Sequence, residues 1–189
     1  MSEALTSGEA RRIIDAVGGG FVGLRDRAYL ALLFRCGLRN NEAIMLDLDD
    51  LHRDREPWSI RVRFPKGIAS GRGKLREIGI DSPTQAILEL WLAIRGNAAG
   101  PLFYTSTKKR IDTSYLRRKV KVLGKAAGIT RRVHPHAFRH AFARGLNDEG
   151  VSIRLIQLAL GHRALNTTAI YLQSLGDPEV IAATSKREW

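Results

Sequence analysis

Apolar positions recur along this chain at two spacings, one typical of helices and one of strands. Thr6-Ser7-Gly8-Glu9 has the spacing of a capping box, which predicts a helix to about Val17 that ends at the glycines 18–20. A second helix, centred on the apolar run LALLF, is predicted from Leu24 to Cys36, and a short one from Asn40 to about Leu46. The first quarter of the chain is therefore expected to be helical.

A strict alternation of apolar and basic residues begins at WSIRVRF, residues 58–64. This alternation predicts a half-buried strand, with KLREIGI at 74–80 as its partner and the glycine-rich KGIASGRG between them as a hairpin loop. Helical spacing then returns, and Trp58 and Trp91 are expected in the core. The expected fold class is mainly α with one small antiparallel β-sheet (α+β). The later helices are predicted from Asp81 through ILELWLAI, at 114–127, 135–147 and 152–160, and after Asn166.

The composition is that of an ordinary globular domain, with 44% apolar and 26% charged residues among 189. No apolar run reaches the roughly 18 residues that span a bilayer, and the first residues lack the apolar core of a signal peptide. The single cysteine, Cys36, excludes an internal disulfide and a cysteine-based zinc site, which is typical of a reducing compartment. A cytoplasmic protein without a membrane partner is expected.

The charge balance points to a polyanionic partner. Lys and Arg number 31 against 19 acidic residues, for a net charge of +12 and a pI near 10.5. Such an excess is typical of nucleic-acid binding, although a ribosome-like or merely basic protein would share it. The basic residues gather in three blocks, at 61–76, at 108–121 and at Arg131-Arg132. Three blocks in one small domain favour binding to a nucleic acid.

Five polar or basic features stand beside the apolar helical segments. Each has an ordinary structural interpretation: a local ion pair, a helix cap, a solvated hairpin lysine, or an aromatic in the core. Their types are nevertheless those that phosphoryl chemistry uses. They are Arg39 three residues before Glu42, Lys66 at the start of the hairpin loop, His136 and Arg139 on one helix face, His162 after a helix end, and Tyr171 nine residues later.

The order of these features resembles the catalytic domain of the tyrosine recombinases, the phage integrase family. The matching text is GLRNNE at 37–42, PKG at 65–67, PHAFRHAFA at 135–143, LGH at 160–162 and TTAIY at 167–171. The resemblance extends back to LTSGEARRIIDA and so covers nearly the whole chain. It implies the fold of the tyrosine recombinase catalytic domain. It also implies the function of a site-specific recombinase or integrase from a prokaryote, phage or plasmid.

The chemistry of strand transfer explains these residue types. A tyrosine phenol, with a pKa of about 10, attacks phosphorus at neutral pH only beside positive charge. Arginine forks suit the non-bridging phosphate oxygens, so fixed charge can replace a metal, and neither metal nor cofactor is expected. The resemblance implies a 3′-phosphotyrosyl intermediate that is rejoined without ATP. It assigns the catalytic roles to Arg39, Lys66, His136, Arg139, His162 and Tyr171, with Lys66 protonating the leaving 5′ oxygen, His136 moving a proton and His162 binding the phosphate.

Other polar residues are expected in supporting or DNA-binding roles. Glu42 is predicted to hold Arg39, His140 to pack or hydrogen-bond within the fold, and His134 to cap the helix or contact DNA. Lys74 is the alternative to Lys66 as the hairpin lysine. The predicted DNA contacts are Arg63, Arg72, Lys74, Arg76, Arg117, Arg118, Arg131 and Arg132.

The resemblance also suggests the organisation of the chain. Residues 1–175 are expected to form the catalytic domain, and 176–189 a tail that docks on a neighbouring protomer or frays. The N-terminal core-binding domain of the family is expected to be absent, in a minimal protein or a fragment. The expected partners are double-stranded DNA, three further protomers in a tetramer on paired sites, and accessory DNA-binding proteins.

Two other functions remain open at this point. A type IB topoisomerase would use the same chemistry to relax supercoils, and a DNA-binding module would need a partner for catalysis. The LGH spacing before Tyr171 and the compact GLRxxE box favour a recombinase over a topoisomerase. The presence of every expected catalytic residue type argues against a module that only binds.

Overall fold

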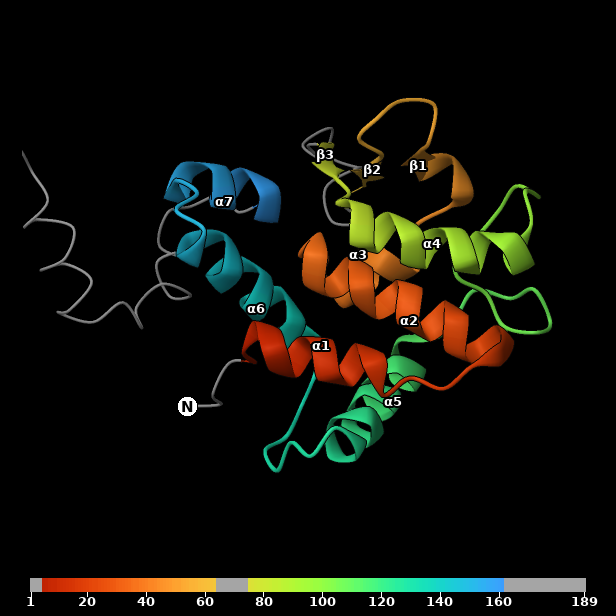
Figure 1. Cartoon of the computed structure of the whole chain (residues 1–189). Helices are drawn as coiled ribbons and strands as arrows, with labels where there is room; N and C mark the ends of the chain where they lie inside the picture. The colour runs from red at the N-terminus through yellow and green to blue at the C-terminus, as the bar shows by residue number, and fades with distance from the viewer. Residues whose placement is uncertain (1–4, 64–74, 162–189) are drawn as a thin grey trace, which may run out of the picture.

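Helices make up most of this computed structural model, which describes residues 5–63 and 75–161 (Figure 1). One small sheet accompanies them, so the predicted α+β class is confirmed. In chain order the elements are α1 (Ser7–Asp15), α2 (Gly20–Arg35), α3 (Asn40–Ile44), the 3-10 turn η1 (Leu48–Asp50), β1 (Leu51–His52), β2 (Ser59–Val62), β3 (Arg76–Gly79), α4 (Ser82–Arg95), α5 (Thr113–Ala126), α6 (Pro135–Asp148) and α7 (Ile153–Leu160).

The helix α2 is the centre of the fold, in contact with α1, α3, α4 and α6 (Figure 1). Its middle is buried on all sides, and Tyr29 meets Phe103 edge to face at 5.2 Å between ring centres. Trp91 of α4 is fully buried and donates from its indole nitrogen to the Leu102 carbonyl at 3.0 Å. Trp58 is buried as well, so both tryptophans occupy the core positions expected of them.

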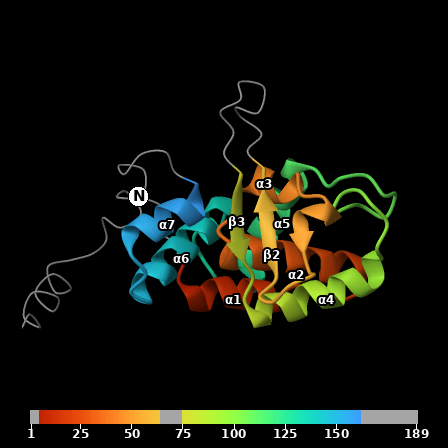
Figure 2. The ribbon, with the colours of Figure 1, turned by 90° about the horizontal axis from the view of Figure 1, so that it is seen from above.

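The predicted strands pair in antiparallel fashion, with Ile60 opposite Ile78 and Arg61 opposite Glu77. Ile60 is buried and Arg61 exposed, which is the alternation read in the sequence. A third strand, β1, was not predicted, because two residues are too few for a periodic signal. Figure 2 shows β3 as the edge strand on the side of α6 and α7, and β3 contacts α7. Residues 64–74 of the hairpin lie outside the described residues.

Two helix starts test the local predictions. The capping box of α1 is confirmed: Glu9 N–H donates to the Thr6 hydroxyl at 3.2 Å, and Thr6 N–H to the Glu9 carboxylate at 2.9 Å. The predicted start of α2 at Leu24 is wrong, because the helix begins at Gly20. Tertiary packing extends this turn, since Phe21 lies 5.2 Å from the ring of Trp91 and 5.8 Å from that of Tyr104.

Candidate active site

An open cleft of about 330 Å³ lies where the starts of α3 and α6 meet α5. Two of the predicted catalytic residues line it, Arg39 and His136, together with Arg117 from the predicted DNA contacts. The cleft is therefore basic and suited to a phosphodiester. Its full lining is Arg39, Asn40, Asn41, Arg117, His134, Pro135 and His136.

The turn before α3 explains the GLR part of the motif. Gly37 has a φ of +60°, and a Cβ there would stand 2.3 Å from the ring of Phe142 on α6. Only glycine combines that conformation with so close an approach. Leu38 is fully buried, and Arg39 follows as the N-cap of α3 with its side chain 38% exposed. The motif thus brings an arginine to the cleft from a turn held against α6.

Glu42, the residue predicted to support Arg39, contacts it at two points. Its carboxylate accepts from the Arg39 backbone N–H at 2.8 Å and from the Arg39 guanidinium Nη1 at 2.7 Å. The three-residue spacing is what makes both contacts possible, because a residue one turn into a helix can reach back to the N-cap. The Glu42 side chain is only 2% exposed.

Arg139 approaches the same carboxylate from α6. Its side chain is fully buried, with Nη1 3.8 Å from Glu42 Oε2. Nη1 also donates to the Gly37 carbonyl at 2.6 Å, and Nη2 to the Leu160 carbonyl at 2.5 Å. Arg139 therefore ties together the turn before Arg39 and the end of α7, at the first residue of the LGH motif.

The prediction that Arg76 contacts the DNA backbone does not fit its surroundings. The Arg76 side chain is 8% exposed and forms a two-pronged ion pair with Glu42, at 3.1 Å from Nη1 to Oε1 and 2.8 Å from Nη2 to Oε2. Arg76 lies on the same face of β3 as buried Ile78 and opposite buried Val62, so the alternation itself favoured the inner face of the sheet. Its partner, 34 residues earlier, had no local signal. A buried site residue was thus mistaken for a DNA contact.

The other predicted DNA contacts differ in their surroundings. Arg63 pairs with Asp50 at 2.8 Å and Asp47 at 3.2 Å, and Arg131 with Glu9 at 2.8 Å, which ties the loop before α6 to α1. The side chains of Arg117, Arg118 and Arg132 are exposed. Lys66, Arg72, Lys74, His162 and Tyr171 lie outside the described residues.

The buried carboxylate stays ionised at any ordinary pH. Burial pushes the pKa of Glu42 up, but hydrogen bonds from Arg76 and Arg39 and their positive charge outweigh it, and the pKa falls to about 2. The cluster of Glu42 with Arg39, Arg76 and Arg139 therefore carries three positive charges and one negative. A net positive, preorganised site of this kind stabilises the charge of an attacked phosphate.

Three histidines near the cleft have lowered pKa values, which favours their uncharged form. Desolvation lowers the pKa of His136, helped by the charge of Arg139, and desolvation with the charge of Arg132 lowers that of His134. The pKa of His140 falls to about 4 because of burial and its histidine neighbours. The His136 and His140 rings lie edge to face, with 5.2 Å between ring centres. A neutral His136 can accept a proton.

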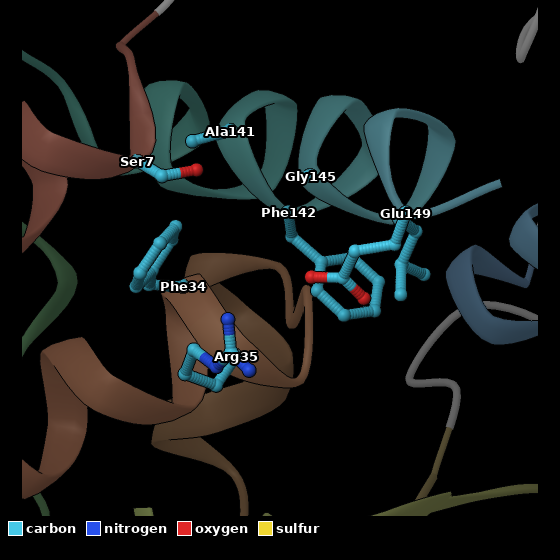
Figure 3. Close-up of a pocket in the computed structure, with 8 residues that line it drawn as sticks. Ser7, Phe34, Arg35, Ala141, Phe142, Gly145 and Glu149 are labelled. Atoms are coloured by element: carbon cyan, nitrogen blue, oxygen red, sulfur yellow. The ribbon is translucent and has the colours of Figure 1, made fainter. Parts of the chain in front are cut away.

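A second, smaller cavity of about 40 Å³ lies among α1, α2 and α6 (Figure 3). It is large enough for water. Figure 3 shows Phe34 and Arg35 of α2 facing Ala141 and Phe142 of α6 across it. No predicted catalytic residue lines it, so it carries no part of the site.

Within residues 5–63 and 75–161, no three His, Cys, Asp or Glu side chains gather as a metal site would require. In the same part of the chain, every helix is too short or too polar to cross a bilayer.

The family model that matches this chain covers residues 3–176 and is described as the phage integrase family. The chain belongs to the phage integrase family. Named relatives include the tyrosine recombinase XerD of Mycobacterium tuberculosis, 33% identical over 90% of this chain and 56% of its own length. XerC of Rhodospirillum centenum is 36% identical over 80% of this chain and 43% of its own. This phage integrase family member thus spans about half the length of such relatives.

Solved structures of named recombinases support the same fold. The XerA recombinase matches with a TM-score of 0.82 and 30% identity over 100% of this chain and 67% of that one. The XerH site-specific recombinase, bound to palindromic difH substrate, matches with a TM-score of 0.80 over 98% of this chain and 53% of that one. At 24% identity this second likeness supports the fold alone.

Proposed function

We propose that this chain is the catalytic part of a site-specific DNA recombinase or integrase, which cleaves and rejoins strands through a 3′-phosphotyrosyl intermediate. The observation that carries the proposal is the arginine cluster around Glu42 beside a basic cleft that also holds His136. Within the phage integrase family, that combination favours transesterification at phosphorus.

The proposed first step forms a bond from the Tyr171 oxygen to phosphorus and breaks the bond from phosphorus to the 5′ oxygen. The Tyr171 proton passes to His136, whose lowered pKa keeps it neutral and able to accept. Arg39 and Arg139 bind the non-bridging oxygens, where charge develops. Lys66 gives a proton to the leaving 5′ oxygen, and His162 donates to the phosphate.

Rejoining reverses these steps with the 5′-hydroxyl of another strand as the attacking group. The phosphotyrosyl bond conserves the phosphodiester free energy, so no ATP is consumed. The charges of the cluster supply the stabilisation that a metal would otherwise give, and the proposal requires no cofactor.

The proposed partner is double-stranded DNA, bound by four protomers on paired sites with accessory DNA-binding proteins. We assign residues 1–175 to the catalytic domain and 176–189 to a tail that docks on a neighbouring protomer. Deleting residues 178–189 should then weaken self-association on DNA. Unchanged sedimentation of the shortened protein on DNA would contradict this docking.

Covalent trapping tests the proposed chemistry. The chain is incubated in EDTA with a library of nicked duplexes of random sequence, denatured in SDS, and compared with Tyr171→Phe. The proposal expects protein-linked DNA with the wild type only, because a nick lets the cleaved end escape rejoining. Adducts that persist in Tyr171→Phe, or their absence from the wild type, would refute it. Relaxation of supercoils without exchange between sites would favour a topoisomerase.

A further inference from the structure

Glu42 has more partners than a simple support for Arg39 needs. A carboxylate offers about four acceptor positions on its two oxygens. Arg39 takes one on each oxygen, through its guanidinium and its backbone N–H, and Arg76 takes one on each as well. Arg139 stands farther off, at 3.8 Å from Oε2. The carboxylate is thus saturated by Arg39 and Arg76.

The charge balance shows what Arg76 changes. Without it, a carboxylate that is 2% exposed would have two open acceptor positions and no solvent to fill them. The nearest donors would be the guanidinium groups of Arg39 and Arg139, which would turn toward Glu42. Each such reorientation would leave one N–H donor fewer, and less positive charge, for an incoming phosphate.

We propose that Arg76 is a positioning residue of the phosphate site, which saturates Glu42 so that Arg39 and Arg139 remain available to the phosphate. The inference rests on the proposed function. Arg76 itself does not touch DNA. The same ion pair fixes the first residue of β3 to α3, so that the strand and the arginine site are held as one unit.

The test compares Arg76→Gln with Arg53→Gln. Both remove one positive charge, but the Arg53 side chain is exposed and contacts Asn97, not Glu42. The rate of adduct formation with saturating nicked DNA should fall about 100-fold in Arg76→Gln, as expected for misplaced catalytic groups. It should be unchanged in Arg53→Gln. An unchanged rate in Arg76→Gln would overturn the proposal.

Salt dependence separates positioning from DNA contact. In a Tyr171→Phe background, Arg76→Gln should leave the slope of log affinity against log salt unchanged. A slope reduced by about one, with the adduct rate restored at saturating DNA, would make Arg76 a phosphate contact and overturn the proposal. If the wild type itself forms no adduct that depends on Tyr171, the proposed function fails first, and this inference with it.

Two further measurements guard against simple misfolding. Arg76→Lys keeps the charge but cannot make the two-pronged contact, so its adduct rate should lie between those of the wild type and Arg76→Gln. Arg39 and Arg139 also lie near Glu42, and His136 interacts with it electrostatically. Without the hydrogen bonds and charge of Arg76, burial is less strongly opposed and the pKa of Glu42 rises. The adduct rate of Arg76→Gln should therefore decline at a higher pH on the acid side than that of the wild type. A wild-type rate in Arg76→Lys with an unmoved acid limb would contradict the proposal.

Discussion

At the scale of single residues, the site is organised by one carboxylate. Glu42 is buried, accepts from Arg39 and Arg76, and lies near Arg139, so its charge is compensated several times over. Its pKa of about 2, against a usual 4.5, means that folding favours the ionised form. A group whose pKa is lowered by folding adds stability above its unfolded pKa and loses it as the pH falls through the folded one.

Replacing Glu42 with Gln should therefore cost about 3 kcal/mol of unfolding free energy at pH 7. The stability of the wild type should fall between about pH 5 and pH 2 relative to Glu42→Gln, since only the wild type loses this ion cluster there. Urea unfolding at several pH values measures both curves. A difference that stays constant from pH 7 to pH 2 would contradict this origin of the stability.

At the scale of elements, the turn between α2 and α3 is set by its contact with α6. Gly37 combines a positive φ with a close approach to Phe142, and its carbonyl receives Arg139. Two different requirements, conformation and space, thus meet at Gly37, two residues before the proposed catalytic Arg39.

Gly37→Ala and Gly128→Ala separate those requirements. Gly128 has a φ of +74° but open space around a Cβ, so its alanine variant should lose only about 1 kcal/mol. Gly37→Ala should lose a further 1–3 kcal/mol or so, because the added methyl would overlap the Phe142 ring. Thermal unfolding of the two variants decides this. Equal losses would mean that the α6 contact adjusts freely.

At the scale of the whole molecule, a net charge of +12 favours a polyanionic partner such as the proposed DNA. Exposed basic side chains on α5 stand next to the cleft, and Arg117 lines it directly. A protein that binds phosphates releases their condensed counterions, and the free energy gained from this release falls as the salt concentration rises.

Binding to duplex DNA should fall by about 1000-fold or more between 50 and 200 mM salt if six or more phosphates are contacted. Arg117→Ala should reduce the salt slope by about one, and Arg117→Lys, which keeps the charge, should not. Fluorescence anisotropy in a Tyr171→Phe background measures both slopes. Affinity that is flat across this salt range would refute a phosphate-dominated interface.

The sequence by itself determined what depends on neighbours within one turn or along one strand. The Thr6–Glu9 capping box, the Arg39–Glu42 pair and the pairing of the two strands were all predictable, because each follows from a short fixed spacing. The order of the motifs also indicated the family, because that order can be read directly from the sequence.

Only the tertiary structure decided the contacts between distant segments. The ion pair of Arg76 with Glu42 spans 34 residues, and the hydrogen bond from Arg139 to the Gly37 carbonyl spans 102. No local pattern encodes such pairs, because they form only when α3, β3 and α6 pack around one buried carboxylate. The start of α2 was missed for the same reason: packing of Phe21 against Trp91 outweighs the glycines' weak preference for helix.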